Sequence, residues 1–284
     1  NKACRVISGK TICKYFGINW SKGKFCRKRL KELKDISHII VDEIFMCPPF
    51  AIKALCYAKK MFPKLKFIFI GDAEQTRPVN YEKLDWTNKK LFYDLCDGNK
   101  LELIRLMRNP KASKIYRKII DVGYRPNNKA DFKRSHINIT RTNKKRMEIN
   151  QEYMEEYCNS NSYFISNDYD ASGNSIYNDK AQDVWLNEGT PVMSIITDED
   201  LGIINSEIYN IDYLDVNEIR INGKIYTEQE FMNSFVVCYA MTNHKIQGMT
   251  INEPFIIWEW DKMTKREKYT AYSRGTERKY ILIM

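Results

Sequence analysis

Two short segments that contain carboxylates follow apolar runs in the first third of the chain. Asp42-Glu43 comes directly after Ile39-Ile40-Val41, and Gly71-Asp72 comes after Phe67-Ile68-Phe69-Ile70. Adjacent carboxylates at such a place suit phosphoryl transfer, because the first can hold Mg²⁺ through water and the second can polarise an attacking water molecule. Taken alone, however, Asp-Glu after an apolar run is equally typical of a strand-to-helix turn with a capped helix.

Three further segments carry polar groups that core packing does not explain. Gly71 permits a tight turn beside a phosphate, and Gln75 could sense a γ-phosphate through its neutral amide. Near the other end of the chain, the segment from Thr242 to Thr250 places hydroxyl, imidazole, amine and amide groups directly after an apolar run. Arg274 lies just before the last apolar run. These groups are the kind that bind and position phosphates.

Strands and a helix must position the carboxylates. Residues 36–41 and 65–70 are short apolar runs that we interpret as buried strands. Between them, apolar residues repeat at helical spacing after Pro48-Pro49, and Pro63 stops the helix. Such strand–helix–strand units form parallel sheets with right-handed crossovers. Both strands end in a carboxylate, and the carboxyl ends of parallel strands are where open α/β sheets bind ligands.

The remaining elements favour a second α/β domain with a β-rich insertion. Asn222-Gly223 is a strong two-residue hairpin signal, and we interpret residues 187–232 as a small antiparallel, barrel-like insertion. We assign residues 124–135 to the crossing between domains and 159–182 to a long surface excursion. We also predict helices over 110–122, ended by Gly123, and 143–157, with strands over 137–140, 235–241, 255–258 and 280–283.

Charge and cysteine usage limit the possible partners and location. Lys and Arg number 46 against 36 Asp and Glu, which gives a net charge of +10. The excess is clustered over residues 22–34 and 141–146, so a polyanion is a natural partner, although a solvated lysine-rich helix would explain the first cluster as well. Eight cysteines occur singly and form no metal-ligand spacing with three histidines. We therefore expect no zinc site, free thiols in a reducing intracellular compartment, and no membrane partner, because no apolar stretch is long enough to span one.

Five blocks, in this order, resemble the motifs of superfamily-one helicases of the RecD-like, 5′-to-3′ branch. Asp42 to Met46 resembles motif II, and Gly71 to Val79 resembles motif III. Leu101 to Asn109 resembles motif IV, Thr242 to Thr250 resembles motif V, and Tyr269 to Arg274 resembles motif VI. Residues 1–18 resemble the DNA-contacting stretch that follows motif I. We use these motif numbers below for the segments of this chain.

The resemblance implies two RecA-like parallel-sheet domains, an N-terminally truncated one over 1–110 and a second over 111–284. It also implies ATP and Mg²⁺ as cofactors and single-stranded DNA as partner of a monomeric motor. By resemblance, Asp42 holds Mg²⁺, Glu43 activates water, Arg274 is an arginine finger, and Arg108 approaches the γ-phosphate, with Arg105 as a competing candidate. The implied nucleotide-binding residues are Asp42, Gly71, Asp72, Gln75, Gln247, Gly248 and Arg274, and the implied strand-binding residues are Thr11, Tyr15, Phe16, Thr242, His244 and Lys245.

One required motif is missing from the printed sequence. These helicases bind the β- and γ-phosphates through a GxxxxGK[ST] loop. Gly9-Lys10-Thr11 does not qualify, because position 4 is Cys4 where the first glycine should stand. We expect this motif I to lie before residue 1, and we expect the chain by itself to be inactive. A catalytically inactive helicase remnant that binds nucleic acid stays an alternative. An RNA helicase of the same superfamily is a second alternative, because no residue here reports on a 2′-hydroxyl.

Overall fold

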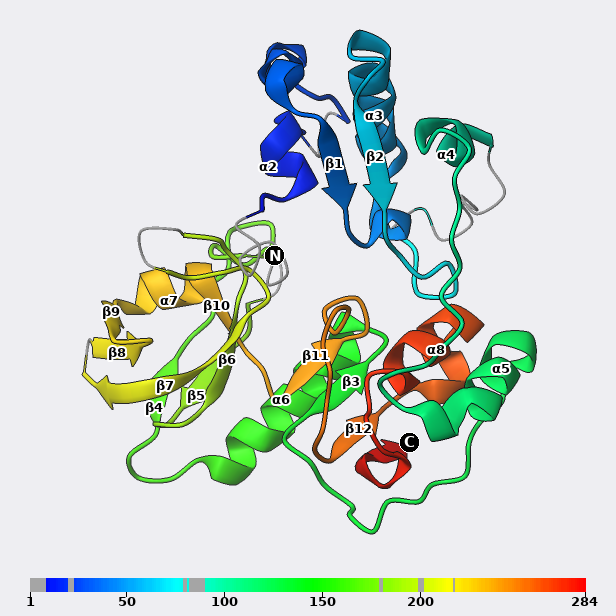
Figure 1. Cartoon of the computed structure of the whole chain (residues 1–284). Helices are drawn as coiled ribbons and strands as arrows, with labels where there is room; N and C mark the ends of the chain where they lie inside the picture. Colours follow the sequence, from blue (N-terminus) through cyan, green and yellow to red (C-terminus); the bar gives the residue numbers. More distant parts are fainter. Residues whose placement is uncertain are drawn as a thin grey trace. The chain divides into compact units, whose positions relative to one another are not determined.

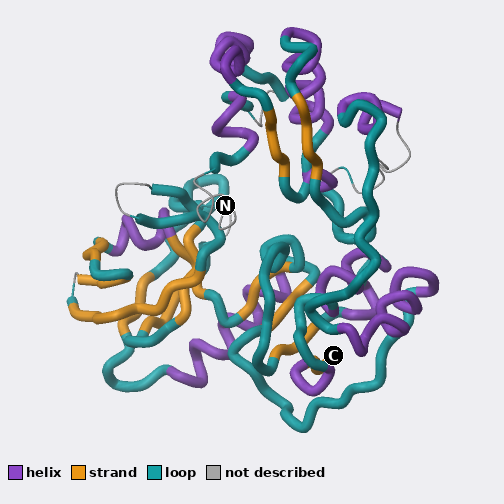
Figure 2. Tube along the Cα trace, viewed as in Figure 1, coloured by secondary structure: helices purple, strands orange, loops and turns teal. Residues whose placement is uncertain are grey.

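A computed structural model describes residues 9–19, 23–78, 81, 90–178, 181–198, 202–216 and 218–284. The chain divides into two compact units, one that ends at Leu106 and one that runs from Met107 to Met284. The first unit contains α2 (Ile12–Phe16), η1 (Arg27–Asp35), β1 (His38–Val41), η2 (Ile44–Met46), α3 (Pro49–Met61), β2 (Lys66–Phe69) and α4 (Lys90–Leu95) (Figures 1 and 2).

The predicted strand–helix–strand unit is confirmed in this first unit. β1 and β2 pair in parallel, with His38 opposite Lys66 and Val41 opposite Phe69. Pro49 opens α3, where its missing N–H costs nothing, and the helix ends at Met61, with Phe62 as its C-cap directly before Pro63. The apolar stripe of α3 packs on one face of the strand pair, where it forms a core with α2 and η1 that includes Ala51, Leu55, Phe67, Leu30 and Phe16.

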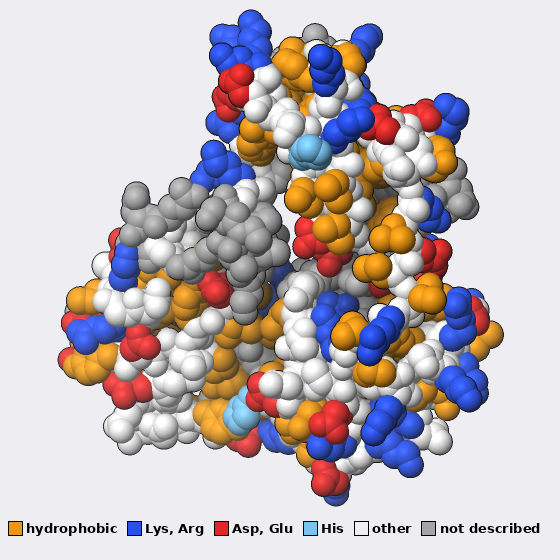
Figure 3. Space-filling view, in the orientation of Figure 1, with side chains coloured by type: hydrophobic (Ala, Val, Ile, Leu, Met, Phe, Trp, Pro, Cys, Tyr) orange, Lys and Arg blue, Asp and Glu red, His pale blue; other side chains and the backbone are white. Residues whose placement is uncertain are grey.

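Burial of these strands on both faces was predicted, and that prediction is wrong for one face. Ile40 is 60% exposed and Ile68 is 47% exposed, whereas Phe67 on the opposite face is 6% exposed. Successive strand residues point to opposite faces of a sheet, and α3 covers only one of them. The other face presents hydrophobic side chains to solvent over β1 and β2 in the view of Figure 3.

The second unit is built on a parallel sheet of four strands in the order β11-β3-β12-β13. Strands distant in sequence meet here: Thr140 in β3 lies opposite Thr242 in β11. Thr142 caps α6, which has the bounds that its pattern predicts. Gly123, in the left-handed conformation at φ 69°, ends α5 as expected. The sheet and its helices are β3 (Asn138–Thr140), β11 (Ala240–Thr242), β12 (Phe255–Ile257), β13 (Ile281–Ile283), η3 (Pro110–Ala112), α5 (Ser113–Val122), α6 (Asn143–Tyr157), η4 (Trp260–Lys262), α8 (Lys265–Tyr272) and η5 (Arg278–Tyr280).

The β-rich region of the second unit is an antiparallel sheet of five strands in the order β10-β6-β7-β8-β9. The predicted hairpin is confirmed, since Asn222 and Gly223 join β8 to β9 with φ of 54° and 72°. Closure into a barrel stays a prediction, because within the described residues β10 and β9 each pair with one neighbour. The strands are β6 (Pro191–Ser194), β7 (Ile208–Asp215), β8 (Glu218–Ile221), β9 (Lys224–Tyr226) and β10 (Phe235–Val237), and the helix is α7 (Glu228–Ser234).

Two boundaries of this region differ from the prediction. The segment 159–182, predicted to be a surface excursion, contains β4 (Tyr163–Ile165), which pairs with β5 (Val184–Leu186) and buries Ile165 in the core. The predicted strand 235–241 is divided between β10 and β11, which belong to different sheets. Both differences arise because a distant pairing partner, and not the local pattern, sets where each strand begins and ends.

The described residues bear on two expectations, that the thiols form no disulfides and that no segment spans a membrane. The cysteines from Cys13 to Cys238 in this part of the chain form no disulfide. Burial raises the pKa of Cys47 and of Cys238 to about 12, so both thiols stay protonated at neutral pH. Among the described residues, no helix combines the length and apolarity needed to cross a bilayer.

Candidate functional site

The carboxyl ends of β1 and β2 bring motif II and motif III together in the first unit. The Ile44 backbone N–H donates to the Ile70 carbonyl at 3.0 Å. Asp42 is exposed, and its Oδ1 accepts the Glu43 backbone N–H at 2.9 Å. Glu43 has a left-handed backbone at φ 51°, a conformation that costs energy for a non-glycine residue and is found most often at functional sites. The paired carboxylates therefore sit on a constrained turn at the strand end, as predicted.

Motif III packs directly against this turn. A Cβ atom on Gly71 would lie 3.0 Å from Phe45 Cδ2 and 3.3 Å from the Ile44 backbone nitrogen. Close packing between the two motifs therefore requires glycine at position 71. The tight turn beside a phosphate, which we predicted for Gly71, stays a prediction. Gln75 donates from Nε2 to Asp72 Oδ2 at 3.2 Å, while its buried Oε1 has no hydrogen-bond partner within the described residues. A buried polar atom of this kind commonly awaits water or a ligand.

The carboxyl ends of β1 and β2 offer a limited set of ligands to a metal ion. Among the described residues, no group of three or more Asp, Glu, His or Cys side chains could hold a metal by itself. Mg²⁺ in phosphoryl-transfer sites, however, keeps several waters and takes one or two carboxylates together with the substrate phosphates. The exposed Asp42 carboxylate fits that mode and does not fit an all-protein metal cage.

The second unit gathers motifs IV, V and VI around two arginines. Arg108 donates from Nε to Thr250 Oγ1 at 3.1 Å and from Nη1 to the Ser273 carbonyl at 2.8 Å. The neighbouring Arg274 is 2% exposed. Burial raises the pKa of Tyr116 to about 12, and the positive charges of Arg108 and Arg274 act against this rise. Three segments widely separated in sequence thus form one cationic cluster.

The Arg274 guanidinium is occupied by contacts inside its own unit. It donates to the Thr270 carbonyl at 2.9 Å, to Ser273 Oγ at 2.9 Å and to the Met249 carbonyl at 3.4 Å. These bonds hold the end of α8 and the motif V loop together. The finger role implied by the resemblance stays a prediction for Arg274. Arg108 is the more exposed of the two guanidinium groups, whereas Arg105 is exposed and belongs to the first unit.

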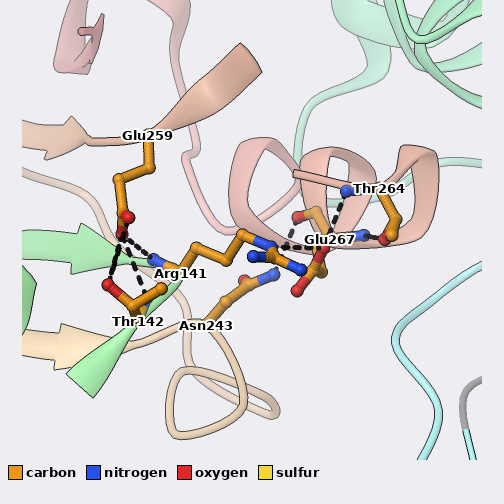
Figure 4. A network of polar contacts seen from close by, with 6 residues as sticks. All are labelled: Arg141, Thr142, Asn243, Glu259, Thr264 and Glu267. Carbon is orange, nitrogen blue, oxygen red and sulfur yellow. Dashed lines mark hydrogen bonds and ion pairs between the residues drawn. The ribbon is translucent and has the colours of Figure 1, made fainter. Parts of the chain in front are cut away.

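A polar network joins the ends of the parallel strands to α8 (Figure 4). Glu259, with a left-handed backbone at φ 57°, accepts the backbone N–H groups of Arg141 and Thr142 at 3.0 Å each. Asn243 in motif V donates to the Glu267 carbonyl at 2.9 Å. The Glu267 carboxylate in turn caps α8 by accepting the Thr264 N–H at 2.7 Å. Motif V and the helix that carries motif VI are therefore tied into one body.

The remaining motif V residues have mixed environments. Lys245 donates from Nζ to Ser206 Oγ at 2.8 Å and to Asn205 Oδ1 at 3.2 Å, so its ammonium group lies against the loop between β6 and β7. Thr242, His244 and Gln247 are half-buried, and Gly248 is exposed with φ of 78°. Contact between Lys245 and a nucleic-acid strand stays a prediction. In the structure the Lys245 ammonium group holds the loop between β6 and β7 beside motif V.

The predicted strand-binding stretch around α2 is only partly suited to that role. Phe16 is 2% exposed and belongs to the same buried core as Leu30 and Leu33, which does not favour its contact with a strand; that contact stays a prediction. Thr11 caps α2 by accepting the Lys14 N–H at 3.2 Å. Tyr15 is half-buried and packs its ring edge-on against Phe16, with centroids 5.3 Å apart. Of the three, Tyr15 keeps a surface that a base could contact.

Sequence reasoning missed several residues that build these clusters. Thr250 and Ser273 bind Arg108, and only their places inside motif V and motif VI could have signalled this. Glu259 gives no sequence signal, because its role depends on a left-handed backbone that glutamate rarely adopts. Val79 of motif III lies outside the described residues.

Comparisons with known proteins identify the fold. The sequence matches no established family model, and no curated protein matches it significantly. Solved structures do match. Pif1 from Bacteroides bound to ssDNA is 18% identical over 97% of this chain and 78% of that one, with a TM-score of 0.67. The same protein with ADP-AlF3 and ssDNA is 19% identical over 99% and 80%, with 0.66. Pif1 helicase from Candida albicans is 14% identical over 99% and 82%, with 0.65.

The chain therefore has the α/β fold of the Pif1 helicases, with two RecA-like domains built on parallel sheets. This confirms the predicted fold class. At these identities the match concerns architecture, and function must be argued from the residues themselves.

Proposed function

We propose that this chain is the motor core of an ATP-dependent helicase or translocase that acts on single-stranded DNA. The observation that carries the proposal is the convergence of Arg108, the motif V loop and Arg274 inside one unit. Their segments are far apart in sequence, so their convergence through these hydrogen bonds supports a built phosphate site. The likeness to Pif1 structures that hold ssDNA and ADP-AlF3 supports the same activity.

The motif resemblance, together with the geometry inside each unit, suggests a division of labour in phosphoryl transfer. Asp42 would hold Mg²⁺ through water, and that ion would neutralise charge on the β- and γ-phosphates when bound. Glu43 would orient or deprotonate the attacking water from its constrained turn, and Gln75 would approach the γ-phosphate with its Nε2 amide as donor, while its buried Oε1 could accept a hydrogen bond from water. Arg108 would stabilise the charge that develops in the transition state, because its guanidinium is held at two points yet is still partly exposed.

The phosphate-binding loop is not among these 284 residues. We propose that the full protein supplies GxxxxGK[ST] from a segment preceding residue 1. The proposed polarity, 5′-to-3′, depends on the resemblance to the RecD-like branch. A second candidate is a remnant that binds single strands without turnover, which the net charge of +10 would favour.

ATP hydrolysis tests the proposal. The chain should be expressed together with the polypeptide encoded upstream of residue 1, and hydrolysis should be measured with and without single-stranded DNA. We expect stimulation by the strand, and we expect Glu43→Gln to lower the rate by about a hundredfold or more. Glu253→Gln is the matched control, because Glu253 is an exposed acid outside the motifs. Equal rates for Glu43→Gln and the unaltered protein would contradict the proposed role.

The same preparation separates the alternatives. Strand binding without any hydrolysis would favour the remnant. Displacement of a strand from RNA substrates but not from matched DNA substrates would identify an RNA helicase, and substrates with a single-stranded tail at one end only would test the 5′-to-3′ direction.

A further inference from the structure

A cavity beside α2 combines residues of the stretch 1–18 with residues of η1, which no predicted motif covers. It has a volume of about 270 Å³ and is lined by Lys10, Lys14, Tyr15, Arg29 and Glu32. Three cations therefore face one carboxylate. Of these residues only Tyr15 belongs to the strand-binding set implied by the resemblance. We call this cavity the α2–η1 pocket.

The geometry of η1 decides which charges face the pocket. A 3₁₀-helix has three residues per turn, so residues three apart share a face. Leu30 and Leu33 form the buried face, and both are fully buried in the core. Arg29 and Glu32 share a second face, which lines the pocket. The third face consists of lysines that are exposed and lie outside the pocket lining: Lys28, Lys31 and Lys34.

The pocket is held in shape by its own contacts. The Arg29 guanidinium donates to the Lys14 carbonyl, which fixes it beside α2. Gly17 allows this approach, because a Cβ there would lie 3.3 Å from Arg29 Cδ and 2.9 Å from Cys26 Cβ, and its φ is 58°. Tyr15 is braced by Phe16. The Arg29 guanidinium is therefore fixed by the fold and does not simply project from the surface.

We propose that the α2–η1 pocket binds one nucleotide of a single strand, with the phosphate on Lys10, Lys14 and Arg29 and the base against Tyr15. A cationic groove beside an aromatic ring is how single strands are bound without sequence preference. Glu32 is consistent with a nucleotide, because a carboxylate would repel a bare phosphate but can accept an N–H from a base. The inference depends on the proposed function and extends the strand contacts beyond the motifs. Lys and Arg side chains gather around this part of the first unit in Figure 3.

Binding of a fluorescein-labelled oligo(dT) to the whole chain, followed by anisotropy, tests the pocket. Arg29→Gln, Lys14→Gln and Lys10→Gln each remove one positive charge from its lining, and we expect each to weaken binding about tenfold. Lys28→Gln and Lys31→Gln remove the same charge from the neighbouring face of η1, and we expect less than about a twofold loss. Each pocket variant should also lower the slope of log K against log salt by about 0.7, whereas the controls should keep it.

The outcomes separate this inference from the proposed function. If pocket and control variants lose equal binding affinity, the loss reflects overall charge alone and the proposed nucleotide pocket is overturned. Strand-stimulated ATP hydrolysis would still support the proposed function in that case. No strand binding by the unaltered chain would overturn both. Lys10→Gln guards against a folding artefact, because Lys10 is exposed at the edge of the described chain and its replacement disturbs no core packing.

Discussion

At the scale of single residues, Arg274 unites a structural role with an implied catalytic one. Its buried guanidinium satisfies the Thr270 and Met249 carbonyls and the Ser273 hydroxyl. We predict that Arg274→Ala lowers the free energy of unfolding by about 2–4 kcal/mol, because these buried acceptors lose their donor. Urea unfolding followed by tryptophan fluorescence measures this. Arg105→Ala removes an exposed arginine and should change stability by less than about 0.5 kcal/mol.

An Arg274→Ala protein as stable as the unaltered chain would contradict this assignment. If the loss is found, reduced ATP hydrolysis in the same variant reflects both roles and does not isolate the arginine finger. Arg108 is then the better probe of phosphate chemistry, since its side chain is half-exposed and its two hydrogen bonds are fewer than those of Arg274.

Residue types and their order predicted that Asp42 and Glu43 stand at a strand end. They did not predict the surroundings of other candidate residues, which burial decides. Asp42 and Glu43 lie where the pattern places them, because the end of a parallel strand is a local feature. Phe16 and Lys245 illustrate what a sequence omits. An aromatic ring can line a surface or a core equally well, and a lysine can contact a strand or a neighbouring loop. Only the packing of η1 on α2, and of the β6–β7 loop on motif V, decides between these uses.

At the scale of elements, the sequence indicates helix ends and tight turns through local residue types, but it does not indicate which strands pair. α6 begins where Thr142 offers a side-chain acceptor, and the β8–β9 turn follows from Asn222-Gly223. By contrast, β4 was missed because its partner β5 lies beyond an Asn-, Ser- and Asp-rich stretch that reads as loop. Likewise, the apolar pattern of β1 does not say whether one face or both will be covered.

The cap of α7 gives a pH-dependent prediction at this scale. Thr227 and Glu230 form a capping box, and the Thr227 backbone N–H lowers the pKa of Glu230. A lowered pKa means that the stabilisation is present above the unfolded value near 4.5 and disappears as pH falls through the folded value. We predict that Glu230→Gln costs a few tenths of a kcal/mol, about the value of an exposed interaction, at pH 7. The difference from the unaltered chain should shrink below about pH 4.5.

Urea unfolding at several pH values from about 7 down to about 2.5 measures the effect. Glu188→Gln is the control, because Glu188 is an exposed acid in the turn before β6. A loss in Glu230→Gln that stays constant over this range, or that grows as pH falls, would contradict the linkage to the Thr227 cap.

At the scale of the whole molecule, long-range order was the least predictable feature. β3 pairs with β11 about a hundred residues later in the chain, with the entire β-rich region between them. No local pattern reports such pairing. The resemblance to helicases predicted a RecA-like parallel sheet with a β-rich insertion, but not which strands pair. The division into two units leaves each with its own hydrophobic core, one around α3 and one between α6 and the β-rich sheet.

Separate cores predict separate unfolding transitions. Leu55 is fully buried in the core of the first unit, and Phe231 is fully buried in that of the second. Leu55→Ala should destabilise the first unit by about 2–5 kcal/mol and Phe231→Ala the second by about 3–5 kcal/mol, because each leaves a cavity that its neighbours fill only partly. In differential scanning calorimetry each variant should lower the temperature of one transition and leave the other in place. A single transition that both variants lower alike would mean that the two units unfold as one cooperative body, and the separation of the cores would then have no energetic consequence.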